Sequence, residues 1–122
     1  LVILPENHPL TQKEKISLSD LGKEPFLLLE KDRNTEISDF FRKHAFFPNV
    51  HFTLWDDYAI LAMVESGMGV SLLPRLILKR IPYQVAVREL DIPAYREIAL
   101  VLKNQKTAPL AVKHFLDYLS YR

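Results

Sequence analysis

The 122-residue sequence contains no cysteine, which excludes disulfide bonds, thiolate metal ligands and cysteine nucleophiles. An excess of charge is also lacking, because 16 Lys and Arg residues are balanced by 15 Asp and Glu residues. With this balance, the sequence shows neither the excess of basic residues typical of nucleic-acid binding nor a basic helix suited to a membrane surface. No apolar run approaches the roughly 20 residues that span a bilayer. With 48% hydrophobic and 25% charged residues, the composition is typical of a single globular domain.

The chain opens on an apolar run, Leu1–Leu4, that predicts a buried strand ending at Pro5. No initiating Met and no basic segment of a signal peptide precedes this run. Because chains rarely begin inside a buried strand, we expect the sequence to be a fragment of a longer protein.

Short apolar runs alternate with amphipathic segments along the rest of the chain. Spacing of apolar residues predicts helices over 37–45 and 57–66 and a final helix over 109–121. Strands are expected at 26–29, 50–54, 70–73, 85–90 and 98–102. This order indicates an α/β fold with a mostly parallel sheet flanked by helices and joined by right-handed crossovers.

Helix ends are marked by residues suited to capping. Ser17 and Asp20 have the spacing of a capping box. Asp56 or Asp57 is placed to cap the helix over 57–66, and Gly67 to end it.

No set of residues forms a catalytic or metal-binding pattern. The four His residues are scattered without ligand spacing. The glycines of Ser66–Gly69 follow a helix and precede a strand, which is the reverse of a phosphate-binding loop. Asp56 and Asp57 could form an acid–base pair, but helix capping already explains them. We therefore predict no enzyme activity, no metal and no cofactor.

One charged loop is placed where ligands bind. It consists of Glu30, Lys31, Asp32, Arg33, Asn34 and Thr35. The loop follows the carboxyl end of a buried strand and precedes a helix N-terminus, a position suited to anions in open α/β sheets. Arg33 would clamp a carboxylate, and Trp55 would add apolar surface. A solvated loop, with Asn34 or Thr35 serving only as a helix cap, is equally compatible with the sequence.

Residues Ile60–Pro74 (ILAMVESGMGVSLLP) resemble the helix–glycine–strand signature of the effector-binding domain of LysR-type transcriptional regulators. The flanking segments resemble the same family in the same order, at Leu1–Leu10, Ile16–Leu29, Arg96–Val101 and Pro109–Leu119. The resemblance therefore runs nearly from end to end.

The resemblance implies a periplasmic-binding-protein-like fold (type 2) with two lobes hinged by crossover strands. Residues 1–95 would form the second lobe, and 96–122 a C-terminal strand and helix returning to a first lobe that is otherwise largely missing. A small-molecule effector of anionic character would lie between the lobes. The loop at 30–35, together with Trp55, Asp57, Met68 and Gly69, would face it.

The resemblance further implies a cytoplasmic, DNA-binding regulator that acts as a homodimer or homotetramer. DNA would be bound only through an N-terminal winged helix-turn-helix outside this sequence, and no membrane would be involved. The alternative is an extracytoplasmic solute-binding protein of the same fold. The apolar face of the final helix, at Ala111, Phe115 and Leu119, is expected to be under-buried within this chain, and to dock on another copy or on an upstream segment.

Overall fold

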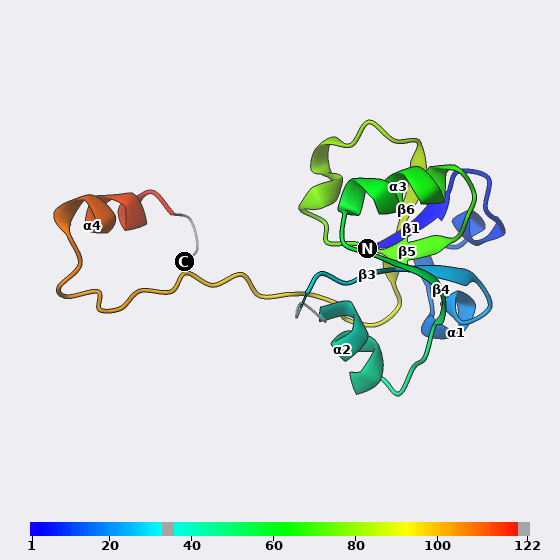
Figure 1. Ribbon diagram of the computed structural model, residues 1–122, viewed down its shortest axis with the longest axis horizontal. Helices are drawn as coiled ribbons and strands as arrows, with labels where there is room; N and C mark the ends of the chain where they lie inside the picture. The colour runs from blue at the N-terminus through cyan, green and yellow to red at the C-terminus, as the bar shows by residue number, and fades with distance from the viewer. Residues whose placement is uncertain (33–35, 120–122) are drawn as a thin grey trace.

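The computed structural model describes residues 1–32 and 36–119. Within these residues one six-stranded sheet has the order β2-β6-β1-β5-β3-β4 (Figure 1). The strands are β1 (Val2–Pro5), β2 (Lys15–Ile16), β3 (Pro25–Leu29), β4 (Asn49–Leu54), β5 (Val70–Leu72) and β6 (Val85–Leu90). The predicted strands at 1–4, 26–29, 50–54, 70–73 and 85–90 are confirmed to within one residue at each end.

The sheet is mixed. Strand β3 pairs in parallel with β4 and β5, as predicted for this segment. Strand β1, however, lies between β5 and β6 and is antiparallel to both. The short strand β2 joins the far edge, parallel to β6. Strands β3, β4 and β5 therefore form a three-stranded parallel unit at one side of the sheet.

Helices flank both faces of the sheet. The described α-helices are α1 (Leu18–Leu21), α2 (Glu36–Lys43), α3 (Asp57–Glu65) and α4 (Leu110–Asp117), with 3-10 turns η1 (Pro9–Gln12) and η2 (Ile77–Arg80). Helix α2 stops before the predicted end at Ala45, because Ala45 has a left-handed φ of 49°. Helix α3 lies over one face, and α1 and α2 lie on the other (Figure 1).

Two apolar clusters fill the space between the sheet and its helices. Alternation along each strand decides which cluster a side chain joins. In β3, Phe26 and Leu28 pack with Phe41 of α2 on one face, and Leu27 packs with Ile60 and Val64 of α3 on the other. The two faces of one strand thus fix the positions of helices on opposite sides.

The C-terminal segment lies apart from the sheet. The strand predicted at 98–102 is wrong: these residues form no strand, and Ile98 and Val101 are 72% and 90% exposed. A strand needs a neighbour for its backbone hydrogen bonds, and this segment lies beside none (Figure 1). Helix α4 lies beyond it, where Phe115 is 58% exposed as expected, although Leu119 is half-buried. No residue of α4 belongs to either core cluster.

The turn from α3 into β5 contains two glycines with different roles. Ser66 is the C-cap of α3, so the sequence prediction that named Gly67 is off by one. Gly67 follows with a φ of 78°, and the amides of Gly67 and Met68 donate to the carbonyls of Val64 and Met63. These paired bonds form a Schellman motif, which favours a left-handed residue at this position.

Gly69, in contrast, is required by close packing. A Cβ atom placed there would lie 2.6 Å from the carbonyl oxygen of Pro25 at the start of β3. We expect Gly69→Ala to lower the free energy of unfolding by about 1–3 kcal/mol. Gly67→Asn should have a much smaller effect, since Asn tolerates the left-handed region and the site is open. Urea unfolding of both variants tests this, and equal losses would contradict it.

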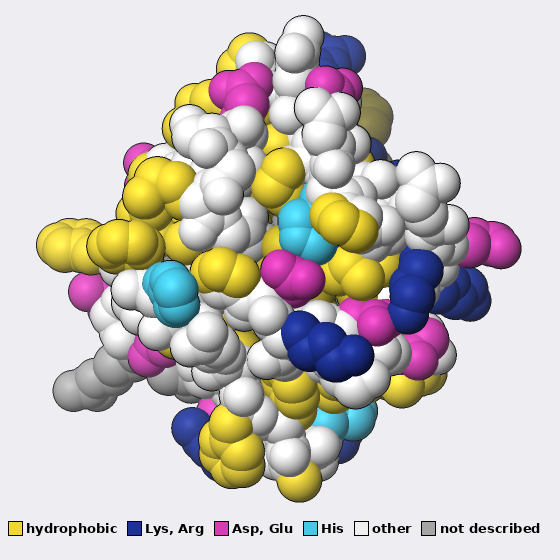
Figure 2. Space-filling model, turned by 90° about the vertical axis from the view of Figure 1, so that its right-hand side faces the viewer, with side chains coloured by type: hydrophobic (Ala, Val, Ile, Leu, Met, Phe, Trp, Pro, Cys, Tyr) yellow, Lys and Arg dark blue, Asp and Glu magenta, His cyan; other side chains and the backbone are white. Residues whose placement is uncertain are grey.

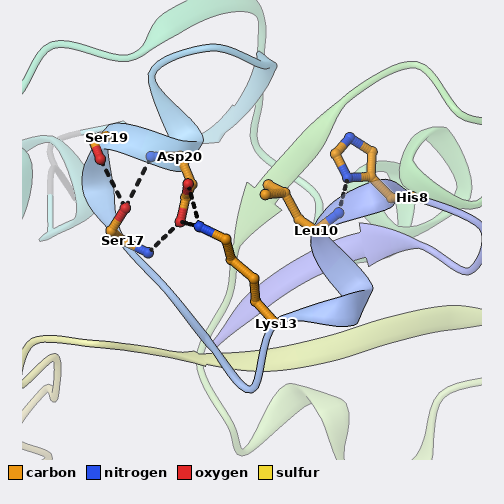
Figure 3. Close-up of polar contacts among 6 residues, drawn as sticks. All are labelled: His8, Leu10, Lys13, Ser17, Ser19 and Asp20. Carbon is orange, nitrogen blue, oxygen red and sulfur yellow. Dashed lines mark hydrogen bonds and ion pairs between the residues drawn. The ribbon is translucent and has the colours of Figure 1, made fainter.

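The start of α1 carries the predicted capping box. The amide of Asp20 donates to Ser17 Oγ (3.1 Å), and the amide of Ser17 donates to Asp20 Oδ2 (3.1 Å). Lys13 Nζ lies 2.8 Å from Asp20 Oδ1 (Figure 3). The hydrogen bond from Lys13, followed by that from the Ser17 amide, lowers the pKa of Asp20 to about 2.

This lowered pKa makes the stabilisation pH-dependent. Ionised Asp20 favours the folded state above its unfolded pKa, near 3.8, and the advantage is lost as the pH falls towards 2. Asp20→Asn should therefore cost about 1 kcal/mol at pH 7 and markedly less at pH 2. Thermal melts across that range measure the difference. Glu14→Gln, at an exposed carboxylate nearby, is the control and should show no such trend; a pH-independent loss for Asp20→Asn would refute the assignment.

Candidate functional site

A cavity of about 220 Å³ opens at the carboxyl ends of the parallel strands. Leu29 ends β3, Trp55 directly follows β4, and Pro74 lies just after β5. The first residues of α2 and α3 also line it, as do four more side chains: Lys31, Ile37, Ile77 and Arg96. Ligands of open α/β sheets bind at this edge.

Charges of both signs line the cavity. Arg96 Nη1 lies 3.4 Å from Glu36 Oε2, and this ion pair joins the segment after β6 to the start of α2. Lys31 and Asp57 supply a second cation and a second carboxylate. The cavity therefore offers contacts for an anion and for a hydrogen-bond donor beside an apolar wall that includes Trp55.

Asp57 is the unusual group in this set. Its Oδ1 atom is buried and has no hydrogen-bond partner among the described residues. Burial raises the pKa of Asp57, and the neighbouring charge of Asp56 adds to the effect. The backbone amide of Asp57 itself acts in the opposite direction and lowers this pKa, and so do Arg96 and Lys31, so both cations are near enough to influence the carboxylate.

The adjacent carboxylate has a different role. Asp56 is the N-cap of α3, and its Oδ1 accepts from the amides of Tyr58 (2.7 Å) and Ala59 (3.1 Å). These first-turn amides are therefore already engaged and are not available to an anion. Capping by Asp56, rather than Asp57, resolves the alternative left open by the sequence.

Part of the charged loop reaches the cavity. Lys31, Trp55 and Asp57 line it together. Glu30 instead holds the loop in place: its amide donates to Leu54 O (2.9 Å), and its Oε2 accepts from Ser38 Oγ (3.0 Å). Asp32 is exposed in a turn with a φ of 52°.

Three of the predicted site residues, Arg33, Asn34 and Thr35, lie outside the described residues. The expected anion contacts of this stretch therefore remain predictions.

Met68 and Gly69 lie elsewhere. They precede β5, whereas the cavity lies at the end where β3, β4 and β5 finish. Gly69 is packed against Pro25, at the beginning of β3. Neither residue lines this cavity, and we leave both out of the site proposed below; that they contact an effector stays a prediction.

The sequence analysis missed six of the lining residues: Leu29, Glu36, Ile37, Pro74, Ile77 and Arg96. Pro74 follows a predicted strand at its carboxyl end, so the edge rule alone could have identified it. Arg96 is 60 residues from Glu36 along the chain, and no local pattern signals their contact.

Two negative findings apply to residues 1–32 and 36–119. No three His, Asp or Glu side chains are grouped to hold a metal ion. No helix there is both long and apolar enough to cross a bilayer.

Comparison with known proteins agrees with this geometry. The family model described as LysR substrate binding domain matches residues 1–122. A curated relative, the uncharacterized HTH-type transcriptional regulator YvbU of Bacillus subtilis, is 30% identical over 118 residues, covering 95% of this chain and 40% of the relative. The chain thus spans about 40% of the length of the curated relatives it matches first.

Solved structures share the fold. The BenM effector binding domain with its effector benzoate has a TM-score of 0.66 at 24% identity, covering 75% of this chain and 44% of that one. The effector binding domain of QuiR in complex with shikimate has a TM-score of 0.64 at 23% identity, covering 77% and 46%. Both are type 2 periplasmic-binding-like domains, as predicted for this sequence. Since the family model covers every residue, the chain belongs to the LysR substrate-binding domain family.

Proposed function

We propose that this chain is the effector-sensing domain of a LysR-type transcriptional regulator and that it binds a small anionic molecule in the 220 Å³ cavity. The observation that carries the proposal is the meeting of Lys31, Arg96 and Trp55 at the carboxyl ends of three parallel strands. Small-molecule sites combine apolar walls with a few polar groups in this way. The cavity is smaller than most drug-sized sites, which favours a metabolite of few atoms.

The ligands of the structural neighbours support an anion. Benzoate, bound by BenM, and shikimate, bound by QuiR, are both carboxylates. In this chain a carboxylate would find its partners in two side chains rather than at α3, whose first amides are bound by Asp56. Lys31 and Arg96 are those partners.

The rest of the regulator is inferred from the family. DNA would be bound by an N-terminal winged helix-turn-helix outside this sequence, and the protein would be a cytoplasmic homodimer or homotetramer. The surface is consistent with DNA binding by another domain. On the face shown in Figure 2, basic and acidic side chains are intermingled, with no basic patch. The similarity to YvbU, which is described as an HTH-type transcriptional regulator, favours this function over that of a solute-binding protein of the same fold.

The two-lobe organisation is also part of the proposal. Residues 1–95 would form the second lobe of the sensor, with 96–122 returning to the first. We expect the bound molecule to leave unchanged, because the carboxylates near the cavity already serve as a helix cap (Asp56) and in an ion pair (Glu36) rather than as a positioned acid or base. Nuclear magnetic resonance of the recovered ligand would detect any conversion.

Fluorescence provides a direct test, because Trp55 is the single tryptophan of the sequence and lines the cavity. We expect saturable changes in Trp55 emission on titration with small carboxylates such as benzoate and shikimate. Lys31→Ala should weaken binding about tenfold, the value of roughly one charge-assisted hydrogen bond.

Lys103→Ala is the matched control, since Lys103 is a cation beyond the cavity. It should bind as the wild type does. Emission that stays constant with every carboxylate, or an equal loss in both variants, would remove the cavity as the anion site.

A further inference from the structure

We propose that the effector is a small dicarboxylate whose second carboxylate binds at Lys79 and Arg80, in a cavity next to that of the proposed function. The inference rests on the proposed function and names the chemical class of its ligand. Its starting point is a second cavity of about 480 Å³, which shares Asp57 and Ile77 with the first.

The second cavity lies beside the first at the same edge of the sheet. Both are lined by Asp57, the first residue of α3, and by Ile77, the first residue of η2. The rest of the second cavity is lined by four further residues: Tyr58, Leu76, Lys79 and Arg80. Because the two cavities have lining residues in common, one small molecule can reach from the first into the second.

The two cavities differ in charge. The first is balanced, with two cationic side chains and two carboxylates. The second contains two cations, Lys79 and Arg80, and only the shared carboxylate of Asp57. Across both cavities, four cations are therefore offset by two carboxylates. A ligand with two negative charges neutralises this excess, whereas a monocarboxylate neutralises half of it.

The two cations of the second cavity have no partner in the fold. Neither Lys79 nor Arg80 forms a side-chain hydrogen bond or ion pair with any residue of 1–32 and 36–119. Arg75, a few residues earlier, is instead paired with Glu89 at 2.9 Å. The fold thus uses one cation of this segment for its own contacts and leaves free the two that line the cavity.

Packing fixes the backbone that carries these cations. Leu78 and Ile81 pack against the apolar cluster beneath α3. Lys79 and Arg80 lie between these two anchors in the sequence, and both are exposed. The amide of Leu78 also donates to the carbonyl of Arg75 (3.1 Å), which closes the turn. The two cations therefore project from a fixed backbone towards solvent, where a ligand can meet them.

Apolar side chains determine what can join the two carboxylates. Ile77 lines both cavities, and Leu76 and Tyr58 extend the wall of the second. The ring of Tyr58 pairs with that of Tyr83, with centroids 6.2 Å apart. A short aliphatic chain would lie along Ile77 and away from Asp57, whose charge repels both ends of the ligand. An aliphatic dicarboxylate matches this arrangement.

Acids of equal carbon number test the second carboxylate directly. The pairs are butyrate and succinate, valerate and glutarate, and hexanoate and adipate; within each pair a carboxylate replaces a terminal methyl group. With the full chain at pH 7, we expect the dicarboxylate of at least one pair to bind about tenfold tighter than its monocarboxylate, as measured by calorimetry.

Variants assign the effect to the second cavity. Lys79→Gln and Arg80→Gln should each reduce the preference for the dicarboxylate about threefold, and the double variant should abolish it. Because both side chains are exposed and unpartnered among the described residues, the melting temperature should change by no more than about 2 °C. A loss of preference is then not a loss of folding.

Arg75→Gln is the matched control. It removes one positive charge from the same segment, but Arg75 is paired with Glu89 and lines neither of the two cavities. The preference for the dicarboxylate should therefore stay intact in this variant.

The outcomes separate the two proposals. Equal binding of both acids in all three pairs, or a preference that survives the double variant, overturns this inference and leaves the proposed function standing. An equal loss of preference in Arg75→Gln would reveal a general attraction of dianions to a basic surface and overturns the inference too. Absence of saturable binding by all six acids overturns both proposals.

Discussion

The position of β1 in the middle of the sheet determines the rest of the architecture. Val2, Ile3 and Leu4 are fully buried, and their strand pairs with β5 on one side and β6 on the other. Because side chains alternate, Val2 and Leu4 enter one core cluster and Ile3 enters the other. The strand therefore couples both helical layers. It also leaves β3, β4 and β5 as an uninterrupted parallel unit, whose carboxyl ends meet at one edge.

Two carboxylates with different hydrogen-bonding environments lie next to each other at that edge of the sheet. Asp56 and Asp57 are adjacent in sequence and identical in chemistry, yet the first is satisfied by helix amides while the second keeps a buried oxygen without a partner. Asp56 thus stabilises the start of α3 as its cap, whereas the raised pKa of Asp57, the next residue, means that ionisation of Asp57 opposes folding. A destabilising residue beside a stabilising one is expected at binding sites, where function and stability place different requirements on the side chains.

Local patterns predicted most of the elements but little of what depends on distant contacts. The capping box at Ser17, the helices α2 and α3, and five strands follow from periodicity and turn chemistry. The antiparallel placement of β1 depends on partners far along the chain, such as Leu72 and Arg88 opposite Val2. The strand expected at 98–102 failed because this segment has no neighbouring strand. In the site, Lys31, Trp55 and Asp57 were accessible to sequence reasoning, whereas Arg96 enters only through the path of the chain after β6. Met68 and Gly69 do not line this cavity, because a motif does not reveal at which end of a strand its side chains lie.

The cavity contains equal numbers of cationic and anionic side chains, which limits how it can select among small anions. Lys31 and Arg96 are offset by Glu36 and Asp57, so a ligand meets little net field. The Glu36–Arg96 pair is half-exposed and 3.4 Å long, and pairs of this kind contribute at most about 1 kcal/mol. Neither overall charge nor this ion pair can therefore discriminate strongly among small anions. Discrimination must come from the positions of individual donors and acceptors, since an unmatched buried polar group is far more unfavourable than a weakened surface contact.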